Sequence, residues 1–325
     1  MAIQDLSNQF ISRSYQGLMQ ISSSGQLFNG IGSLITAVSV AGTLSNGLNT
    51  VTSGSYSHAE GDNTRATGFA SHAEGFNTIA YGYASHTEGY STVTSGAYSH
   101  AEGEYAVASG YASHAEGFNT IASGSHSHTE GYVTVASGNH SHAEGHSTVA
   151  IGDRSHAEGY STTASGSYSH AEGESTIASG QSSHAEGTST SAIGNYSHAE
   201  GRSTSTIGNF SHAEGFNTIA SGLYQHVQGQ YNQSSSIQSA FMHGNGTSNA
   251  NRSNLIYAYG TGNNGVVEIS GSLKVSQSIT GSLFGSATLI PVTASTVTAG
   301  SIYFDTGSNK LYIHNGTAWK TASLG

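Results

Sequence analysis

The chain has 325 residues, of which 8% are charged, 44 are Gly, one is Pro and none is Cys. Lys and Arg total 8 against 19 Asp and Glu, so a basic surface for nucleic acid is missing and nucleic acid is not an expected partner. The lack of Cys excludes a disulfide framework and thiol chemistry. A chain rich in Gly and Ser is either disordered or tightly wound, and its period decides between the two.

Residues 1–49 carry no repeat and are predicted to be an N-terminal attachment segment. The first five residues lack the basic region of a secretory signal. The mildly apolar stretch from Leu27 to Leu44 is interrupted by Gly and Ser, which makes it too polar for a membrane span. We therefore expect no membrane insertion.

An uninterrupted 14-residue repeat fills the centre of the chain. Ser-His-(Ala/Thr)-Glu-Gly occurs in twelve copies, from Ser57 to Gly215, and Gln225-His-Val-Gln-Gly229 keeps the register as a thirteenth. The consensus is S-H-A-E-G-x-x-T-x-A-x-G-x-x, and we number its positions 1 to 14. A period this regular excludes disorder, and it is shorter than the period of about 33 residues or more that helical repeats require.

Fourteen residues accommodate two short strands and two turns. Gly at positions 5 and 12 is predicted to supply the turns, where a positive φ is needed. Side chains alternate along a strand, so Ser, Ala, Thr and Ala at positions 1, 3, 8 and 10 should face inward. His and Glu at positions 2 and 4 should then share the outer face, and stacked coils should place His over His and Glu over Glu.

The predicted fold is an all-β, parallel β-roll (a solenoid) over residues 50–232, with strands at each His-Ala-Glu and each Thr-x-Ala. Coils about 4.8 Å apart would form a rod of roughly 60 Å. Ala and Gly bury little apolar area per ordered residue, so the roll is expected to need partner chains. Three-fold closure is the usual solution for a fibre, and the sequence does not exclude two-fold closure.

Three further regions follow the roll. Residues 233–268 break the period and are predicted to be a cap or transition region. Residues 269–300 contain two ten-residue units that begin at Ile269 and Ile279 and suggest a slender β-linker. Residues 301–325 combine two strand-like runs with an Asn315-Gly316 turn signal and predict a small β-meander.

The repeat resembles the head repeat of trimeric autotransporter adhesins such as YadA, which has Ser-Val-Ala-Ile-Gly where this chain has Ser-His-Ala-Glu-Gly. The Ser-His-Ala-Glu-Gly variant, its Gln-His-Val-Gln-Gly ending and the C-terminal Tyr303-Phe-Asp and Lys310-Leu-Tyr runs are similar to those of phage tail-fibre and appendage proteins. The resemblance implies a left-handed roll, three chains around one axis, and repeat positions 2 and 4 facing that axis.

The resemblance and the invariance of positions 2 and 4 together predict a hydrogen-bonded ladder of His and Glu at the subunit contact. A row of divalent metal sites is the alternative for the same residues. The predicted ladder comprises His58, Glu60, His72, Glu74, His86, Glu88, His100, Glu102, His114, Glu116, His128, Glu130, His142, Glu144, His156, Glu158, His170, Glu172, His184, Glu186, His198, Glu200, His212 and Glu214.

Catalysis is not expected, because adjacent Ser and His on a strand point to opposite faces and cannot form a Ser–His pair. No cofactor is predicted. The one alternative is a transition metal on the trimer axis, held by the His-x-His pairs His126/His128 and His140/His142.

The predicted function is a structural, homotrimeric fibre of a phage virion, attached to other virion proteins through one end and extracellular once assembled. It would present an adhesion surface for a host glycan or protein. Neither a secretory signal nor the membrane anchor of bacterial autotransporters is recognised, which favours the virion over the alternative of a bacterial surface adhesin.

An ice-binding solenoid is a further alternative because Thr recurs at position 8, although Ala is the usual residue at position 10. Aromatic residues recur at position 6, where they either bind glycans or cover the edge of the roll or neighbouring chains.

Overall fold

The computed structural model describes residues 20–21, 27–28, 43–262, 264–271, 302–305, 310–315 and 317–321. The chain divides into two compact units, residues 1–271 and 272–325. Every regular element among the described residues is a β-strand. No helix long and apolar enough to cross a membrane occurs in these ranges.

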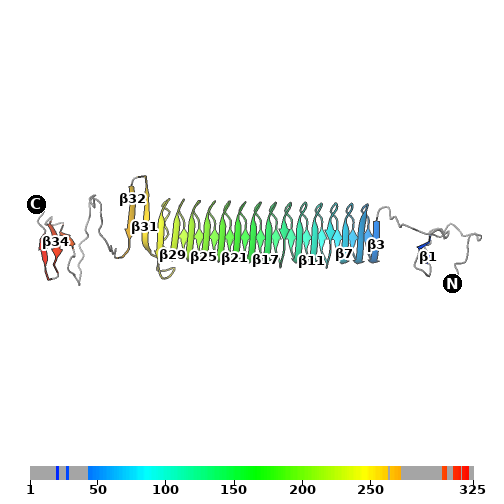
Figure 1. Cartoon of the computed structure of the whole chain (residues 1–325), viewed down its shortest axis with the longest axis horizontal. Helices are drawn as coiled ribbons and strands as arrows, with labels where there is room; N and C mark the ends of the chain where they lie inside the picture. Colours follow the sequence, from blue (N-terminus) through cyan, green and yellow to red (C-terminus); the bar gives the residue numbers. More distant parts are fainter. Residues whose placement is uncertain are drawn as a thin grey trace, which may run out of the picture. The chain divides into compact units, whose positions relative to one another are not determined.

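The first unit is a parallel β-solenoid in which each 14-residue coil contributes one strand to each of two sheets (Figure 1). Strands of the His-containing sheet begin at position 1 or 2 of the repeat; they are β5 (Ser57–Asp62), β7 (His72–Phe76), β9 (His86–Thr87), β11 (His100–Glu104), β13 (His114–Phe118), β15 (His128–Thr129), β17 (His142–His146), β19 (His156–Tyr160), β21 (His170–Glu174), β23 (His184–Thr188), β25 (His198–Arg202), β27 (His212–Phe216) and β29 (His226–Gln230).

The second sheet has 13 parallel strands of two residues each, at positions 9 and 10. They are β4 (Val51–Thr52), β6 (Arg65–Ala66), β8 (Ile79–Ala80), β10 (Val93–Thr94), β12 (Val107–Ala108), β14 (Ile121–Ala122), β16 (Val135–Ala136), β18 (Val149–Ala150), β20 (Thr163–Ala164), β22 (Ile177–Ala178), β24 (Ser191–Ala192), β26 (Ser205–Thr206) and β28 (Ile219–Ala220). The predicted all-β, parallel solenoid is confirmed.

Neighbouring coils pair in strict register, so each repeat position forms a column. In β11 and β13, for example, His100 lies opposite His114 and Glu102 opposite Glu116. An insertion of one residue would turn every later inward side chain outward. Register is therefore maintained by the absence of insertions between Ser57 and Gly229.

The interior is made almost wholly of small side chains. Ala at positions 3 and 10 and Thr at position 8 are 0–1% exposed, and Ser at position 1 is about as buried at 1–2%. The larger buried side chains Val227, Gln225, Asn232 and Met242 all occur near the C-terminal end of the roll. The predicted inward positions are confirmed, and the interior holds too little apolar bulk to resemble an ordinary globular core.

The turns differ from the prediction. Gly at position 5 does have a positive φ, as in Gly117 with φ 102°, but Gly at position 12 does not. The left-handed residues of the turns are instead the non-glycine residues at positions 7 and 14, such as Asn119 (φ 52°) and Ala112 (φ 51°). Gly at position 12 is required for space, because a Cβ on Gly124 would lie 1.9 Å from the carbonyl oxygen of Gly138.

The roll also extends beyond its predicted limits at residues 50 and 232. At the N-terminal end, β3 (Thr43–Leu48) pairs in parallel with β5, with Gly47 opposite Gly61. At the other end, β30 (Phe241–Asn245) pairs in parallel with β29, with Gly244 opposite Gly229. These outer coils keep the glycine column but lose His and Glu, which is why the repeat motif did not reveal them.

An antiparallel hairpin of β31 (Asn254–Thr261) and β32 (Asn264–Ile269) follows β30 within the predicted cap region. In the N-terminal segment, β1 (Gln20–Ile21) pairs with β2 (Leu27–Phe28). The second unit contains an antiparallel sheet of β33 (Ile302–Asp305), β34 (Lys310–His314) and β35 (Trp319–Thr321). Most of the predicted β-linker, residues 272–300, lies outside the described residues.

Candidate functional site

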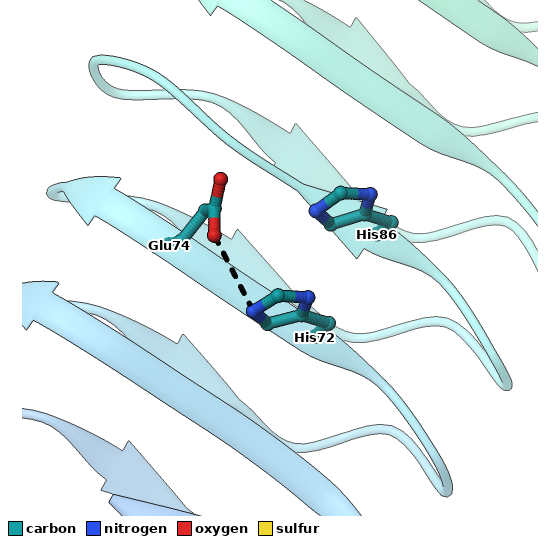
Figure 2. A group of neighbouring side chains, drawn as sticks. All are labelled: His72, Glu74 and His86. Atoms are coloured by element: carbon teal, nitrogen blue, oxygen red, sulfur yellow. Dashed lines mark ion pairs between the residues drawn. The ribbon is translucent and has the colours of Figure 1, made fainter. Parts of the chain in front are cut away.

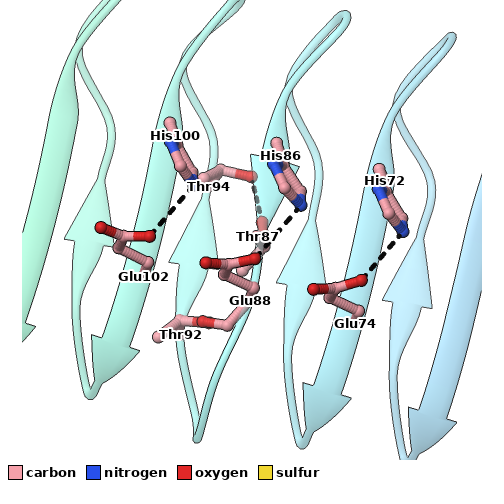
Figure 3. A network of polar contacts seen from close by, with 9 residues as sticks. All are labelled: His72, Glu74, His86, Thr87, Glu88, Thr92, Thr94, His100 and Glu102. Carbon is pink, nitrogen blue, oxygen red and sulfur yellow. Dashed lines mark hydrogen bonds and ion pairs between the residues drawn. The ribbon is translucent and has the colours of Figure 1, made fainter.

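The outer face of the His-containing sheet has two parallel columns of ionisable side chains. We call them the His column (the twelve His at position 2, His58 to His212) and the Glu column (the twelve Glu at position 4, Glu60 to Glu214). Rings of successive His stack face to face, with centroids 4.7–4.9 Å apart and planes within 9° of parallel. Figure 3 shows His72, His86 and His100 arranged in this way beside Glu74, Glu88 and Glu102.

Each His Nε2 points toward the Glu column (Figure 2). From His58 to His114 the nearest paired carboxylate belongs to the same coil, at 3.6–3.9 Å. Most later His pair with the Glu of the preceding coil, for example His212 with Glu200 at 3.4 Å. The pairing changes from the same coil to the preceding coil at Glu116, which pairs with both His114 and His128.

These distances correct one part of the predicted ladder. An N–H···O hydrogen bond has a donor–acceptor distance of about 2.7–3.2 Å, and the N···O distances here are 3.4–4.0 Å. Within the described roll, the Nε2 atoms of all twelve motif His are shielded from solvent and have no hydrogen-bond partner. His and Glu are therefore close neighbours in a single chain, but they do not form the predicted hydrogen bonds there.

The surroundings of seven imidazoles in the His column favour their neutral form. Burial, followed by the neighbouring imidazoles, lowers the pKa of His72, His100, His142, His184 and His212. The same two causes lower the pKa of His114 and His156. If two successive imidazoles were both charged, their rings would lie less than 5 Å apart and repel each other, so stacking disfavours protonation of neighbours.

The direction of the pKa shift alternates along the Glu column, from Glu88 to Glu200. Hydrogen bonding between adjacent carboxyls, with burial and like-charge repulsion, raises the pKa of Glu88, Glu116, Glu144, Glu172 and Glu200 to about 7. The intervening Glu102, Glu130, Glu158 and Glu186 have a lowered pKa, chiefly because they accept those hydrogen bonds. Carboxylates this close cannot all ionise, so neighbours share protons.

An open groove follows the Glu column and the adjacent glycines. It runs from Asn46 to Gly145, and a second groove runs from Glu158 to His243. The side chains of the two columns are about one-third exposed, for example 37% for His114 and 31% for Glu116. This face of the isolated chain is therefore incompletely covered, although its residues are the most regular in the sequence.

The predicted separation of Ser from His is observed. Ser at position 1 points into the roll, where its hydroxyl donates to the carbonyl of the preceding position-12 Gly, as in Ser57 to Gly54 at 2.6 Å. His at position 2 lies on the outer face. The Ser and His of a described repeat therefore lie on opposite sides of the strand and do not form a pair.

The two His-x-His pairs are divided between columns. His126 and His140 stack on each other at position 14 and continue a row that includes Tyr111, whereas His128 and His142 belong to the His column. Strand alternation does not reach position 14, because residues there have a positive φ. An axial metal held by these four imidazoles remains a prediction.

Two other columns bear on function. Thr at position 8, including Thr64, Thr78 and Thr120, is completely buried, so the Thr column cannot contact ice. The position-6 aromatics lie along an edge of the roll, where Phe76 stacks on Tyr90 and Phe118 on Tyr132. Phe76, Tyr90 and Tyr132 are still 43–46% exposed, so the stacked rings present an aromatic surface on the outside of a single chain.

Residues 101–127, 143–169 and 171–197 match the family model described as the YadA head domain repeat (2 copies). The match confirms the resemblance to this repeat, and all three matched segments lie within the solenoid. No curated protein matches the chain significantly.

Proposed function

We propose that the chain forms the shaft of a homotrimeric fibre, with the His and Glu columns of three chains facing a common axis. The observation that carries this proposal is the uncovered but invariant outer face: twelve His and twelve Glu are kept without exception and are about one-third exposed in one chain. A surface that only meets solvent would tolerate variation there, as position 9 of the opposite sheet does.

The interior supports the same conclusion. Buried Ala, Ser and Thr contribute little apolar area for each residue that folding must order. Partner chains seated on the open groove would add the missing buried area. YadA head repeats come from trimeric adhesins, which favours three chains over two.

The absence of Cys from the sequence provides a direct test of the axis. Glu144→Cys should place three thiols near the axis, so a three-armed maleimide should join three chains. Ser137→Cys, at an exposed position directly after β16 of the second sheet, is the matched control and should remain uncrosslinked. Light scattering should give three times the chain mass. A folded monomer, or stronger crosslinking through position 137, would refute the arrangement.

We further propose that the fibre belongs to a phage virion, as a tail fibre or appendage attached through residues 1–49 and presenting an adhesion surface. The similarity of the Ser-His-Ala-Glu-Gly variant and the C-terminal runs to phage appendage proteins supports this location. Gold-labelled antibodies against the roll should decorate purified particles.

A bacterial surface adhesin is the second candidate, because the YadA head repeat is a component of such adhesins. Labelling of intact uninfected cells, with none on particles, would establish this alternative and overturn the virion location.

A further inference from the structure

The His and Glu columns bring together trios of potential metal ligands. Each trio consists of a His, the Glu two residues later and the His of the next coil, and its three ligand atoms lie within 4.8 Å of one another. Examples are His72–Glu74–His86, His114–Glu116–His128, His170–Glu172–His184, His184–Glu186–His198 and His198–Glu200–His212. Two imidazoles and one carboxylate are a ligand set used by zinc and similar divalent ions.

The spacing within a trio suits such an ion better than it suits a hydrogen bond. Two ligands on one tetrahedral zinc, with bonds of about 2.0–2.1 Å, lie about 3.4 Å apart. The His–Glu N···O distances begin at that value, 3.4 Å for His212 with Glu200, and extend to 4.0 Å. Three atoms that are at most 4.8 Å apart all lie within about 2.8 Å of a common point, so small side-chain rotations toward that point would complete the bonds.

The ligand atoms are also free of competing hydrogen bonds. The Nε2 atoms have no hydrogen-bond partner in the described roll, so no existing bond would be lost. A divalent ion would offset the like-charge repulsion between neighbouring carboxylates of the Glu column. The groove that follows this column leaves room for water as a fourth ligand.

The parallel stacking of the His rings places one geometric condition on metal binding by a trio. Parallel stacked rings direct their Nε2 atoms along parallel lines, so one ring of each trio must tilt toward the ion. Such a tilt occurs without a change in spacing at the end of the column, where the rings of His212 and the following His226 are inclined by 45° at a centroid distance of 4.8 Å.

We propose that the His and Glu columns bind divalent ions of the zinc class, each ion in a His–Glu–His trio that shares no His with another occupied trio. All three protein ligands come from one chain, so the proposal is independent of the trimer. Each ion uses two His, and twelve motif His therefore limit a chain to six ions.

The test measures metal uptake by the whole chain. Chelator-stripped protein is dialysed against micromolar zinc at neutral pH, and bound metal is counted by mass spectrometry. We expect several zinc ions for each chain, with little uptake of calcium or magnesium. Cobalt in place of zinc should give the intense visible bands of a tetrahedral site. Less than one zinc ion for each chain would overturn the proposal.

A matched pair of variants locates the ions. Changing Glu116, Glu130, Glu144 and Glu158 to Gln removes carboxylate ligands but keeps hydrogen-bonding groups, and should lower uptake by at least two ions. Changing Glu104 and Glu174 to Gln, at the edge of the roll outside the Glu column, should lower it by none. Equal uptake by both variants would overturn the assignment. If the first variant does not fold, the cobalt spectrum of the unaltered chain decides, since octahedral bands would refute the trio.

Light scattering on the same samples separates this proposal from the trimer. A monomer that binds zinc would refute the trimer alone, and a trimer that binds none would refute the metal site alone.

Discussion

The two sheets of the roll have the same interior neighbours but very different outer faces. On the second sheet, position 9 is Val51, Arg65, Ile79, Thr163 or Ser191 in different coils. On the His-containing sheet, positions 2 and 4 do not vary in twelve coils. Both faces are exposed in one chain, so exposure does not explain the difference. Contacts along a column do, because they require the same group at every level, and the proposed contact with other chains would impose the same requirement.

The largest effect should come from the interior shared by both sheets. Gly138→Ala would place a Cβ 2.1 Å from the carbonyl oxygen of Gly152, and neither backbone can move without breaking the register. We expect a loss of about 3 kcal/mol or more in the free energy of unfolding, measured by denaturant titration. Ser137→Ala at the neighbouring exposed position should change it by less than about 0.5 kcal/mol. A stable Gly138→Ala protein would contradict the close approach of the coils.

A smaller effect should distinguish the two faces directly. His142→Thr removes a ring stacked between His128 and His156, and should cost about 1 kcal/mol. Val149→Thr, on the other strand of the same coil, imitates Thr163 in the next coil and should cost less than about 0.5 kcal/mol. Equal losses in thermal or chemical denaturation would show that the invariant face is no more constrained than the variable one.

The pH dependence should reveal the shared protons of the Glu column. Glu88 and Glu116 have a pKa raised from 4.5 to about 7, so their contribution to stability is full below 4.5 and is lost as pH rises through 7. The lowered pKa of His100 and His114 acts oppositely: that contribution is present above 6.5 and is lost as pH falls through the lowered value.

The His contribution still increases from pH 6.5 to about 7.5, because an unfolded His is half protonated at 6.5, so the decline that belongs to the Glu column is isolated by comparing variants from pH 6.5 to 8. Replacing Glu88 and Glu116 with Gln should flatten this decline in the denaturation midpoint, and Glu104→Gln should not. An unchanged slope in the double variant would show that the carboxyls do not share protons.

The smallest effect is expected from removing both polar groups of one coil. His114→Val with Glu116→Ile imitates the Ser-Val-Ala-Ile-Gly repeat and leaves no unpaired partner within that coil. A matched exchange of this kind can be close to neutral, whereas Glu116→Ala alone leaves His114 and His128 without their shared carboxylate. The denaturation midpoints and particle masses of the two variants test this expectation. A double variant less stable than Glu116→Ala would show that apolar residues cannot replace His and Glu at the proposed interface.

The sequence by itself determined the central architecture. The 14-residue period predicted the parallel solenoid, and strand alternation predicted that Ser, Ala and Thr are buried while His and Glu share the outer face. These predictions succeeded because in-register stacking places every repeat position in the same environment at each level. The family match supports the repeat that the sequence indicated.

Tertiary structure decided what depends on closure of the coil and on distances between side chains. It showed that positions 7 and 14, rather than Gly at position 12, adopt the left-handed conformation. It added the outer coils at β3 and β30, where pairing with an existing strand compensates for a degenerate motif. It also placed the His and Glu atoms too far apart for a hydrogen bond, because their separation is set by strand geometry and by stacking in each column, and neither can be measured along the sequence.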